Sequence, residues 1–263
     1  MGTSSGTSVT FLGHAAFRLR SPEGVEVVVD PWTHGNPLCP PSLRELGQVD
    51  LALVTHGHHD HVGDLFSIVA KTGPRVVAVA ELGHWMRRRG LHRVQTMNLG
   101  GVLELDGVEV VMTPAAHSSS IDDEPAVNAG VAAGFVLGFS DGLRVYHAGD
   151  TAAFAGMALV GEVQRPDVAL LPMGDEHTMG PREAAVATRL LGVRRVVPMH
   201  YGIAPGSDDV PRRFRAALDA LGLGSVEVLA LRPGEGITWD AAASALTAST
   251  SSVPSDPQLP ASS

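Results

Sequence analysis

Short apolar runs separated by glycine, proline and aspartate recur along residues 9–239, and this pattern predicts many short β-strands. The predicted strands cover residues 9–12, 16–19, 25–29, 49–54, 75–79, 102–105, 108–112, 131–139, 143–147, 168–172, 195–199, 226–229 and 236–239. Apolar residues at helical spacing predict helices at residues 62–70, 81–89, 182–191 and 210–221.

The order of these elements indicates the fold class. Hairpins come first in each half of the chain, two of them with Asp-Gly turns, and strand–helix alternation follows. Two mixed β-sheets packed together with helices outside fit this order, so we predict an α/β protein. One core can accommodate 263 residues. We expect one domain at residues 9–240, a flexible N-terminus at residues 1–8, and a disordered Ala/Ser/Thr/Pro-rich tail at residues 241–263.

Residues 55–61, Thr-His-Gly-His-His-Asp-His, concentrate metal-binding side chains between a predicted strand and a predicted helix. On an extended backbone, side chains two apart point the same way, so His56, His58 and Asp60 can share one side. The turn into the helix then brings His61 within reach. Imidazole nitrogens and a carboxylate in one place are typical ligands of zinc and similar cations. The segment predicts a metal site, and a histidine-rich surface loop is the alternative.

Further candidate ligands follow other strands. His117, Asp150 and His200 each lie just past the carboxyl end of a different predicted strand. Active sites of layered α/β folds collect at such strand ends. A single histidine at a strand end would mean little, but four strand ends that each provide a His or Asp favour one shared metal site.

Composition narrows the classes of function. The formal charge of −9 and the absence of a Lys/Arg-rich block disfavour nucleic acid as a partner. Cys39 is the only cysteine, which excludes an internal disulfide and a cysteine-based metal site. Residues 1–8 do not resemble a secretory signal, and no apolar run reaches the length of a membrane span. We therefore expect a cytoplasmic protein with a small-molecule substrate and no membrane span.

The H-x-H-x-D-H motif at residues 56–61, with the later His, Asp and His, resembles the metallo-β-lactamase superfamily. Residues 12–17, 30–32, 35–37, 146–151 and 172–174 resemble one branch of it. That branch holds uncharacterised metal-dependent hydrolases related to L-ascorbate-6-phosphate lactonase and, more distantly, to the phospholipase D that acts on N-acyl-phosphatidylethanolamine. The resemblance covers about residues 9–239 and implies a four-layer αββα sandwich, metals at one sheet edge, and a homo-oligomer.

In this family seven side chains hold two divalent cations, three for each ion and one between them. The corresponding residues are His56, His58 and His117 for the first ion, Asp60, His61 and His200 for the second, and Asp150 as the bridge. Zn²⁺ is the expected ion, with Mn²⁺, Ni²⁺ and Fe²⁺ as alternatives, because geometry and supply decide the metal. The resemblance also favours hydrolysis over redox chemistry, since flavo-diiron oxidases typically carry a glutamate where His58 stands.

The implied chemistry is hydrolysis by a hydroxide that bridges the two cations. Two cations about 3.5–4 Å apart can share a water and lower its pKa towards neutrality. We expect Asp60 to orient this hydroxide and to accept its proton. His177, past the strand at residues 168–172, is a candidate proton donor to the leaving group, against a purely structural role.

Four more residues are candidates for contact with the substrate or with the ligands. Asp30 and Thr151 are expected to accept hydrogen bonds from ligating imidazoles. His14 is expected near the mouth of the site, where a structural role is the alternative. Tyr201, next to His200, is a candidate for hydrogen bonding to a substrate oxyanion, and packing is its alternative role.

The sequence alone does not decide which type of bond is cleaved. A lactone or carboxylic ester is favoured, and a phosphodiester is the alternative on the same site. A basic residue near the mouth, for which Arg18 and Arg182 are candidates, would favour a phosphorylated substrate. Two alternatives are not hydrolases: an iron-bound redox protein and a non-catalytic metal-binding protein. The full ligand set disfavours the latter, because purely structural zinc sites are closed and four-coordinate.

Overall fold

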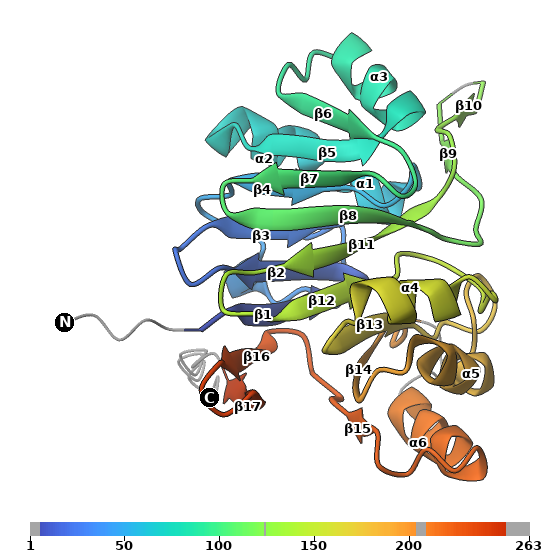
Figure 1. Cartoon of the computed structure of the whole chain (residues 1–263). Helices are drawn as coiled ribbons and strands as arrows, with labels where there is room; N and C mark the ends of the chain where they lie inside the picture. The colour runs from blue at the N-terminus through green and yellow to red at the C-terminus, as the bar shows by residue number, and fades with distance from the viewer. Residues whose placement is uncertain (1–5, 124, 204–208, 251–263) are drawn as a thin grey trace, which may run out of the picture.

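The structure is a computed structural model of the chain, and it describes residues 6–123, 125–203 and 209–250. Two large β-sheets lie face to face, with helices on the outside (Figure 1). The first sheet has the order β17 (Ala245–Thr250), β16 (Glu235–Asp240), β1 (Ser8–Gly13), β2 (Ala16–Arg20), β3 (Glu26–Val29), β4 (Leu51–Leu53), β5 (Arg75–Val79) and β6 (Val94–Met97). This arrangement confirms the predicted αββα fold class.

The second sheet has the order β15 (Glu227–Val228), β14 (Arg195–Met199), β13 (Val168–Pro172), β12 (Arg144–His147), β11 (Ala133–Gly138), β8 (Val108–Pro114) and β7 (Val102–Leu105). A separate two-stranded ribbon joins β9 (Ser120–Ile121) and β10 (Val127–Asn128). The helices are α1 (His59–Val62), α2 (Leu65–Thr72), α3 (Ala80–Arg88), α4 (Met157–Gln164), α5 (Pro181–Leu191) and α6 (Val210–Ala220), and a 3₁₀ turn covers Pro41–Leu43. None of the described helices has the length and apolar character needed to span a bilayer.

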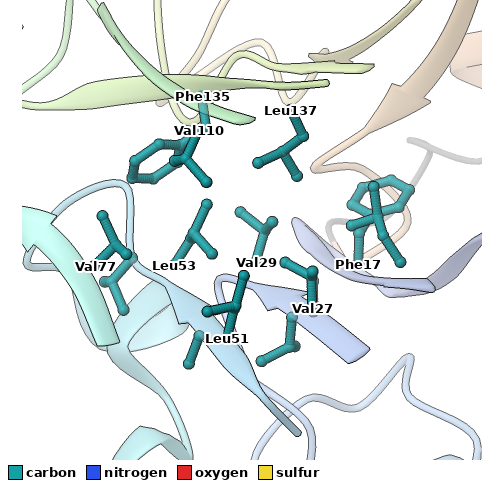
Figure 2. Close-up of a cluster of buried hydrophobic side chains, with 14 of the residues drawn as sticks. Phe17, Val27, Val29, Leu51, Leu53, Val77, Val110, Phe135 and Leu137 are labelled. Atoms are coloured by element: carbon teal, nitrogen blue, oxygen red, sulfur yellow. The ribbon is translucent and has the colours of Figure 1, made fainter. Parts of the chain in front are cut away.

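The main hydrophobic core lies between the two sheets. Figure 2 shows apolar side chains from both sheets meeting in this layer. The first sheet contributes Phe17, Val27, Val29, Leu51, Leu53 and Val77, and the second contributes Val110, Phe135 and Leu137. Each of these side chains is buried, and burial of one Val, Leu or Phe stabilises a fold by about 1.5–3 kcal/mol. This packing fixes how the ends of the two sheets face each other.

A second core lies on the outer face of the second sheet. Alternate residues of its strands point outward, so Val136, Tyr146 and Leu171 pack among the apolar faces of α4, α5 and α6. Figure 1 shows these three helices grouped beside β12, β13 and β14. The inner strands of this sheet are therefore buried on both faces, which explains their continuous apolar sequences.

Parallel pairing brings the ligand-bearing strand ends together. In the first sheet β3, β4, β5 and β6 run parallel, and in the second β12, β13, β14 and β15 do. Strand β4 leads into the histidine-rich segment, β12 leads to Asp150, and β14 ends immediately before His200. Strand β8 leads to His117. The predicted placement of candidate ligands just past strand ends agrees with these strand bounds.

The structure corrects the expected domain edges. Residues 245–250, expected in the disordered tail, form β17, which pairs antiparallel with β16. The Asp240 side chain accepts hydrogen bonds from the backbone N–H groups of Ala242 and Ala243, so it shapes the turn, and Leu246 packs on the main core. At the other end Thr7, expected in the flexible N-terminus, is buried, and its N–H donates to Asp141. Residues 1–5 and 251–263 lie outside the described residues.

Three other differences concern local elements. The helix expected at residues 62–70 is divided into α1 and α2 at Gly63, which has a positive φ of 44°. A Cβ at this glycine would lie 2.6 Å from the Cα of Trp32, so close packing also requires glycine there. Helix α4 and strand β6 had not been predicted. Helix α4 is apolar on its buried and exposed sides alike, so its sequence lacks a clear helical period.

His147 joins the two sheets near the ligand-bearing end. Its Nε2–H donates to the carbonyl oxygen of Ala15 at 2.9 Å, and its Nδ1 accepts from the N–H of Gly149 at 3.2 Å. The imidazole is fully buried, and burial lowers its pKa, with partial compensation by the charge of Asp30. The hydrogen bonds also require the neutral ring, because a protonated Nδ1 could not accept from Gly149.

We predict that His147 makes the metal-free protein less stable in mild acid. The unfolded chain binds a proton at this histidine below about pH 6.5, whereas the folded chain does not. Stability from this group is therefore fully present above pH 6.5 and is lost as the pH falls from there towards the folded pKa. Denaturant unfolding at pH 7.5 and 5.5, in chelator, should show that wild type loses up to about 1.4 kcal/mol more than His147→Gln. Equal losses in the two proteins would contradict the prediction.

Candidate metal centre

The histidine-rich segment changes from extended to helical backbone within a few residues. His58 is the extended residue before α1, with φ −66° and ψ 150°, and its carbonyl accepts from the N–H groups of His61 and Val62. His56 and His58 thus project from extended chain, whereas Asp60 and His61 project from the first helical turn. A Cβ at Gly57 would lie 2.6 Å from the Cβ of Ala129, so the close approach of the β10–β11 connection requires glycine here.

Three imidazoles form a first cluster at this edge. The ligand atoms of His56, His58 and His117 all lie within 4.8 Å of one another. His56 Nε2 lies 2.9 Å from His58 Nδ1, and the ring of His117 is 5.1 Å from each of the other two rings, nearly perpendicular to both. His56 and His58 follow a strand of the first sheet, and His117 follows a strand of the second.

A second cluster contains Asp60, His61 and His200, and His14 joins it. Their ligand atoms also lie within 4.8 Å of one another. The Oδ2 atom of Asp60 lies 3.7 Å from His61 Nε2, 3.8 Å from His200 Nε2 and 2.8 Å from His14 Nε2. This cluster also combines residues from both sheets. His200 follows β14 of the second sheet, whereas Asp60 and His61 lie on α1, which follows β4 of the first sheet.

Asp150 lies between the two clusters. Its Oδ2 atom is 3.7 Å from Nε2 of His117 in the first cluster. The same oxygen is 3.3 Å from Nε2 of His61 and 3.0 Å from Nε2 of His200 in the second. One carboxylate oxygen within reach of imidazoles from both clusters is the geometry that a carboxylate shared by two cations requires.

The chemistry of the donor atoms fits divalent cations. The Nε2 atoms of His61 and His200 and the Oδ1 atom of Asp150 are buried and make no hydrogen bond in the described structure. A buried polar atom without a partner costs about 1–3 kcal/mol. Convergence of several such nitrogen and oxygen atoms within a few ångströms is explained if they coordinate zinc or a similar ion.

The pKa shifts differ between the clusters. Burial lowers the pKa values of His56, His58 and His117, and their neighbouring imidazoles add to this effect. Burial acts in the same direction on His61, but the carboxylates of Asp150 and Asp30 outweigh it and raise the pKa well above its usual value. The environment of the first cluster therefore favours neutral imidazoles, the form that binds a cation, whereas the carboxylates beside His61 favour its charged form.

The two carboxylates of the site are held in their charged form. Burial alone would raise the pKa of Asp60, but the hydrogen bond with His14 and the charge of His61 together lower it. Burial likewise opposes the charged form of Asp150, and the charges of His61 and His200 hold its pKa well below the usual range. For His14, burial dominates and lowers the pKa to about 4, although the hydrogen bond with Asp60 acts in the opposite direction.

Asp30 lies directly behind His61 and orients it. The Nδ1–H of His61 donates to Asp30 Oδ2 at 2.7 Å, and Asp30 also accepts from the N–H and the hydroxyl of Thr55. Asp30 is fully buried and has a positive φ of 49°. A carboxylate that accepts the second N–H of an imidazole fixes both ring orientation and tautomer, which is the usual support of a metal-binding histidine.

Thr151 has a different role from the one we expected. Its hydroxyl accepts from the N–H of Ala116 at 2.9 Å and donates to the carbonyl of Ala152 at 2.6 Å. It therefore holds the backbone next to His117 and does not accept from an imidazole. Within the described residues its two hydrogen bonds are both to main-chain groups, and the expected bond from a ligating histidine is not among them.

The structure does not bring His177 or Tyr201 into the clusters. His177 is exposed, and within the described part of the chain it makes no hydrogen bond or ion pair with a cluster residue. Tyr201 packs at the edge of the second core and lines an apolar cavity of about 350 Å³ with Phe11, Leu38 and Leu231. His200 has a positive φ of 59°, which turns the chain, so its neighbour points towards this cavity.

Sequence reasoning missed two supporting residues. The hydroxyl of Thr55 donates to Asp30 and lies 3.0 Å from His56 Nδ1, so it connects the two clusters. Asn36 is buried, and its amide donates to the carbonyls of Gly13 and Trp32. Asn36 lies in a segment that carries the family resemblance, and Thr55 directly precedes the ligand motif, so their positions in the sequence were the available signal.

Comparison with known proteins places this chain in a family. Residues 26–201 match the family described as Beta-lactamase superfamily domain. A UPF0173 metal-dependent hydrolase of Rubrobacter xylanophilus is 45% identical over 232 residues, which cover 88% of this chain and 96% of the relative. A second such protein, from Koribacter versatilis, is 40% identical over 235 residues, covering 89% of this chain and 98% of the relative.

A solved structure shows the same likeness. Igni18, a metallo hydrolase from the archaeon Ignicoccus hospitalis, superimposes with a TM-score of 0.78 at 37% identity, covering 89% of this chain and 98% of that protein. The fold, the clustered His and Asp residues and these relatives agree with one another. The chain therefore belongs to the metallo-β-lactamase superfamily, in its branch of metal-dependent hydrolases.

Proposed function

We propose that this protein is a dinuclear metal-dependent hydrolase of small ester-like substrates, with lactones and carboxylic esters as the favoured class. The observation that carries the proposal is the position of Asp150 Oδ2, within 3.0–3.7 Å of imidazole nitrogens from both clusters. A site for one ion would not need a carboxylate between two complete sets of donors. The names of the relatives support metal-dependent hydrolysis, and they leave the substrate open.

The donor atoms divide between two cations, most simply Zn²⁺. Three residues would hold each ion, and Asp150 would contact both: His56, His58 and His117 for the first, and Asp60, His61 and His200 for the second. When bound, such ions supply a water activated near neutral pH and polarise the scissile carbonyl or phosphoryl oxygen. The pair Asp30–His61 keeps one of these imidazoles in a fixed orientation.

The proton of the attacking water is assigned to Asp60. Its side chain is 20% exposed, whereas that of Asp150 is 3% exposed, so Asp60 is the carboxylate that a substrate-side water can reach. Its neighbours keep it charged, as a proton acceptor must be before the reaction. The same carboxyl can return the proton to the leaving alkoxide. We prefer Asp60 over His177 for this second step, because His177 is exposed and, among the described residues, forms no hydrogen bond or ion pair with the clusters.

The surroundings of His117 support an uncharged substrate. An open cavity of about 500 Å³ adjoins His117 and is lined by hydroxyl, amide and aliphatic groups. Its lining residues are Ala115, His117, Ser118, Ser119, Ser120, Ala126, Val127, Asn128, Gly130, Val131 and Ala132. None of these lining residues is an aspartate, a glutamate, a lysine or an arginine. A phosphodiester would gain more from a cavity with fixed positive charge.

The two arginines considered for phosphate binding do not contribute here. Arg18 donates to Glu26 at 2.8 Å and lines a different cavity with Ser8 and Thr10. Arg182 is exposed on α5, and it forms no ion pair within the described residues. Both placements favour the lactone or ester over the phosphodiester.

We predict about two zinc ions per chain in protein purified without chelator, measured by elemental analysis. The protein should hydrolyse members of a panel of lactones and aryl esters and should act poorly on bis(p-nitrophenyl) phosphate. Dialysis against chelator should abolish turnover, and added Zn²⁺ or Mn²⁺ should restore it. Bound iron with visible absorbance and oxygen consumption would instead support the redox alternative. Less than one ion per chain after reconstitution would refute the dinuclear site.

Asp60→Asn tests the proton transfer. The amide has nearly the shape of the carboxylate but cannot accept the water proton, so kcat should fall by about 10²–10⁴ at saturating zinc. Asp122→Asn, an exposed carboxylate nearby, is the matched control and should retain turnover. Metal content is measured in parallel. Full turnover of Asp60→Asn with both ions bound would remove this residue from the chemistry.

A further inference from the structure

His14 contacts two of the residues assigned to the second metal ion, and it does so with different parts of the same residue. We propose that His14 is the positioning residue of the second site: its side chain orients Asp60 and its main chain holds His200. The inference rests on the proposed two-metal function. It adds a residue that lies far from the ligand motif in sequence and comes from the first hairpin of the chain.

The side-chain contact is directed at the oxygen that faces the site. His14 Nε2 lies 2.8 Å from Asp60 Oδ2. That oxygen is also the one that lies 3.7 and 3.8 Å from the Nε2 atoms of His61 and His200. A hydrogen bond to this oxygen fixes the rotation of the carboxylate, and with it the direction of the remaining lone pair. Without the bond, Asp60 could turn its carboxylate towards solvent.

The main-chain contact acts on the other ligand. The backbone N–H of His200 donates to the carbonyl of His14 at 2.7 Å, and the two rings lie 3.9 Å apart. His14 belongs to the turn between β1 and β2 of the first sheet, whereas His200 follows β14 of the second. The bond therefore crosses between the sheets and ties the end of β14 to the turn that also supports Asp60.

Both histidines adopt backbone conformations that need support from their surroundings. The φ angles are +57° for His14 and +59° for His200, in the left-handed region that few residues other than glycine adopt. Such residues cost of order 1–3 kcal/mol each and concentrate at functional sites. Here the two residues with positive φ are the two partners of one hydrogen bond, from the N–H of His200 to the carbonyl of His14.

The turn that carries His14 is itself held rigidly. Gly13 has a φ of +106°, and a Cβ there would lie 2.9 Å from Leu38 Cβ, so glycine is required. The amide of Asn36 donates to the carbonyls of Gly13 and Trp32 at 3.1 Å. The Trp32 ring packs edge-on against the imidazole at 5.2 Å, and His14 is only 6% exposed. The imidazole therefore has little freedom to move away from Asp60.

The contacts of the second ring nitrogen favour positioning over direct coordination. A metal-binding imidazole almost always donates its other N–H to an acceptor. His61 follows this rule, with Nδ1 2.7 Å from Asp30, whereas Nδ1 of His14 is buried and has no hydrogen-bond partner among the described residues. A hydrogen on Nε2 satisfies the bond to Asp60 and leaves only an unpaired acceptor at Nδ1. Coordination through Nε2 would instead bury an unpaired N–H donor.

The test is the affinity of chelator-treated full-length protein for the two metal ions, titrated with Co²⁺ and followed by its visible absorbance. His14→Leu removes the donor, and His14→Gln can place an amide N–H close to the original Nε2. Both substitutions keep the same positive φ, so the difference between them reports the hydrogen bond. His92→Gln, at an exposed histidine, is the control.

In His14→Leu, binding of the second equivalent should weaken by about 10–100-fold, while the first equivalent is unchanged. In His14→Gln, the second affinity should return to within about threefold of wild type, and the spectrum at saturation should match wild type in both variants. Thermal unfolding of the metal-free proteins checks that the variants fold, and His14→Ala, which also lacks the donor, carries the test if His14→Leu does not fold.

Two outcomes would overturn the inference. An unchanged second affinity in His14→Leu would show that Asp60 and His200 need no help from this side chain. A second-site spectrum altered in both variants at saturation would show that His14 is a ligand. Wild type that binds a single Co²⁺ would instead refute the proposed dinuclear function and this inference with it, so the two failures are distinguishable.

Discussion

The packing of one sheet against the other is the constraint on which the site depends. Each cluster takes residues from both sheets: His58 and His117 meet in the first, and Asp60 and His200 meet in the second. Neither cluster exists in one sheet alone. The apolar layer in Figure 2 therefore acts on the chemistry as well as on stability, since a change in the distance between the sheets would separate the donors of both ions.

Polar contacts at the ligand-bearing end make this packing specific. His147 donates to Ala15, His200 donates through its backbone to His14, and the N–H of Ala133 donates to the carbonyl of Thr55. All three hydrogen bonds run between the sheets. Hydrophobic burial is not directional, whereas these bonds fix register, so they convert a general attraction between sheets into defined distances between ligands. Bound cations would reinforce the same junction, because metal binding stabilises the state that presents the donors.

Much of the fold and the site could be predicted because the signals are local. The motif at residues 56–61 lies where a strand changes to a helix, and apolar runs mark the strand ends that carry Asp150 and His200. Alternation along a strand gives no prediction where the backbone departs from regular geometry. Tyr201 follows a residue with positive φ, so its direction cannot be read from strand periodicity. Contacts such as His14–Asp60 depend on how distant segments align, and sequence spacing does not contain that information.

The two clusters differ in a way that bears on how a substrate approaches. His61 and Asp150 are almost completely buried, and the second cluster is supported from behind by Asp30 and from the side by His14. The first cluster is more open: His117 borders the neutral cavity, and His58 lies 3.5 Å from the hydroxyl of Ser118.

In the proposed dinuclear enzyme, the ion at the first cluster would therefore face the substrate, while the ion at the second would be the rigidly held one. His58 and His117, on the serine-lined side, would hold the ion that polarises an ester carbonyl entering from that side. Asp60, the partly exposed carboxylate of the second cluster, would take the proton of the attacking water. Polarisation of the substrate carbonyl is thus assigned to the first cluster, and acceptance of the water proton to Asp60. Ester hydrolysis needs both functions.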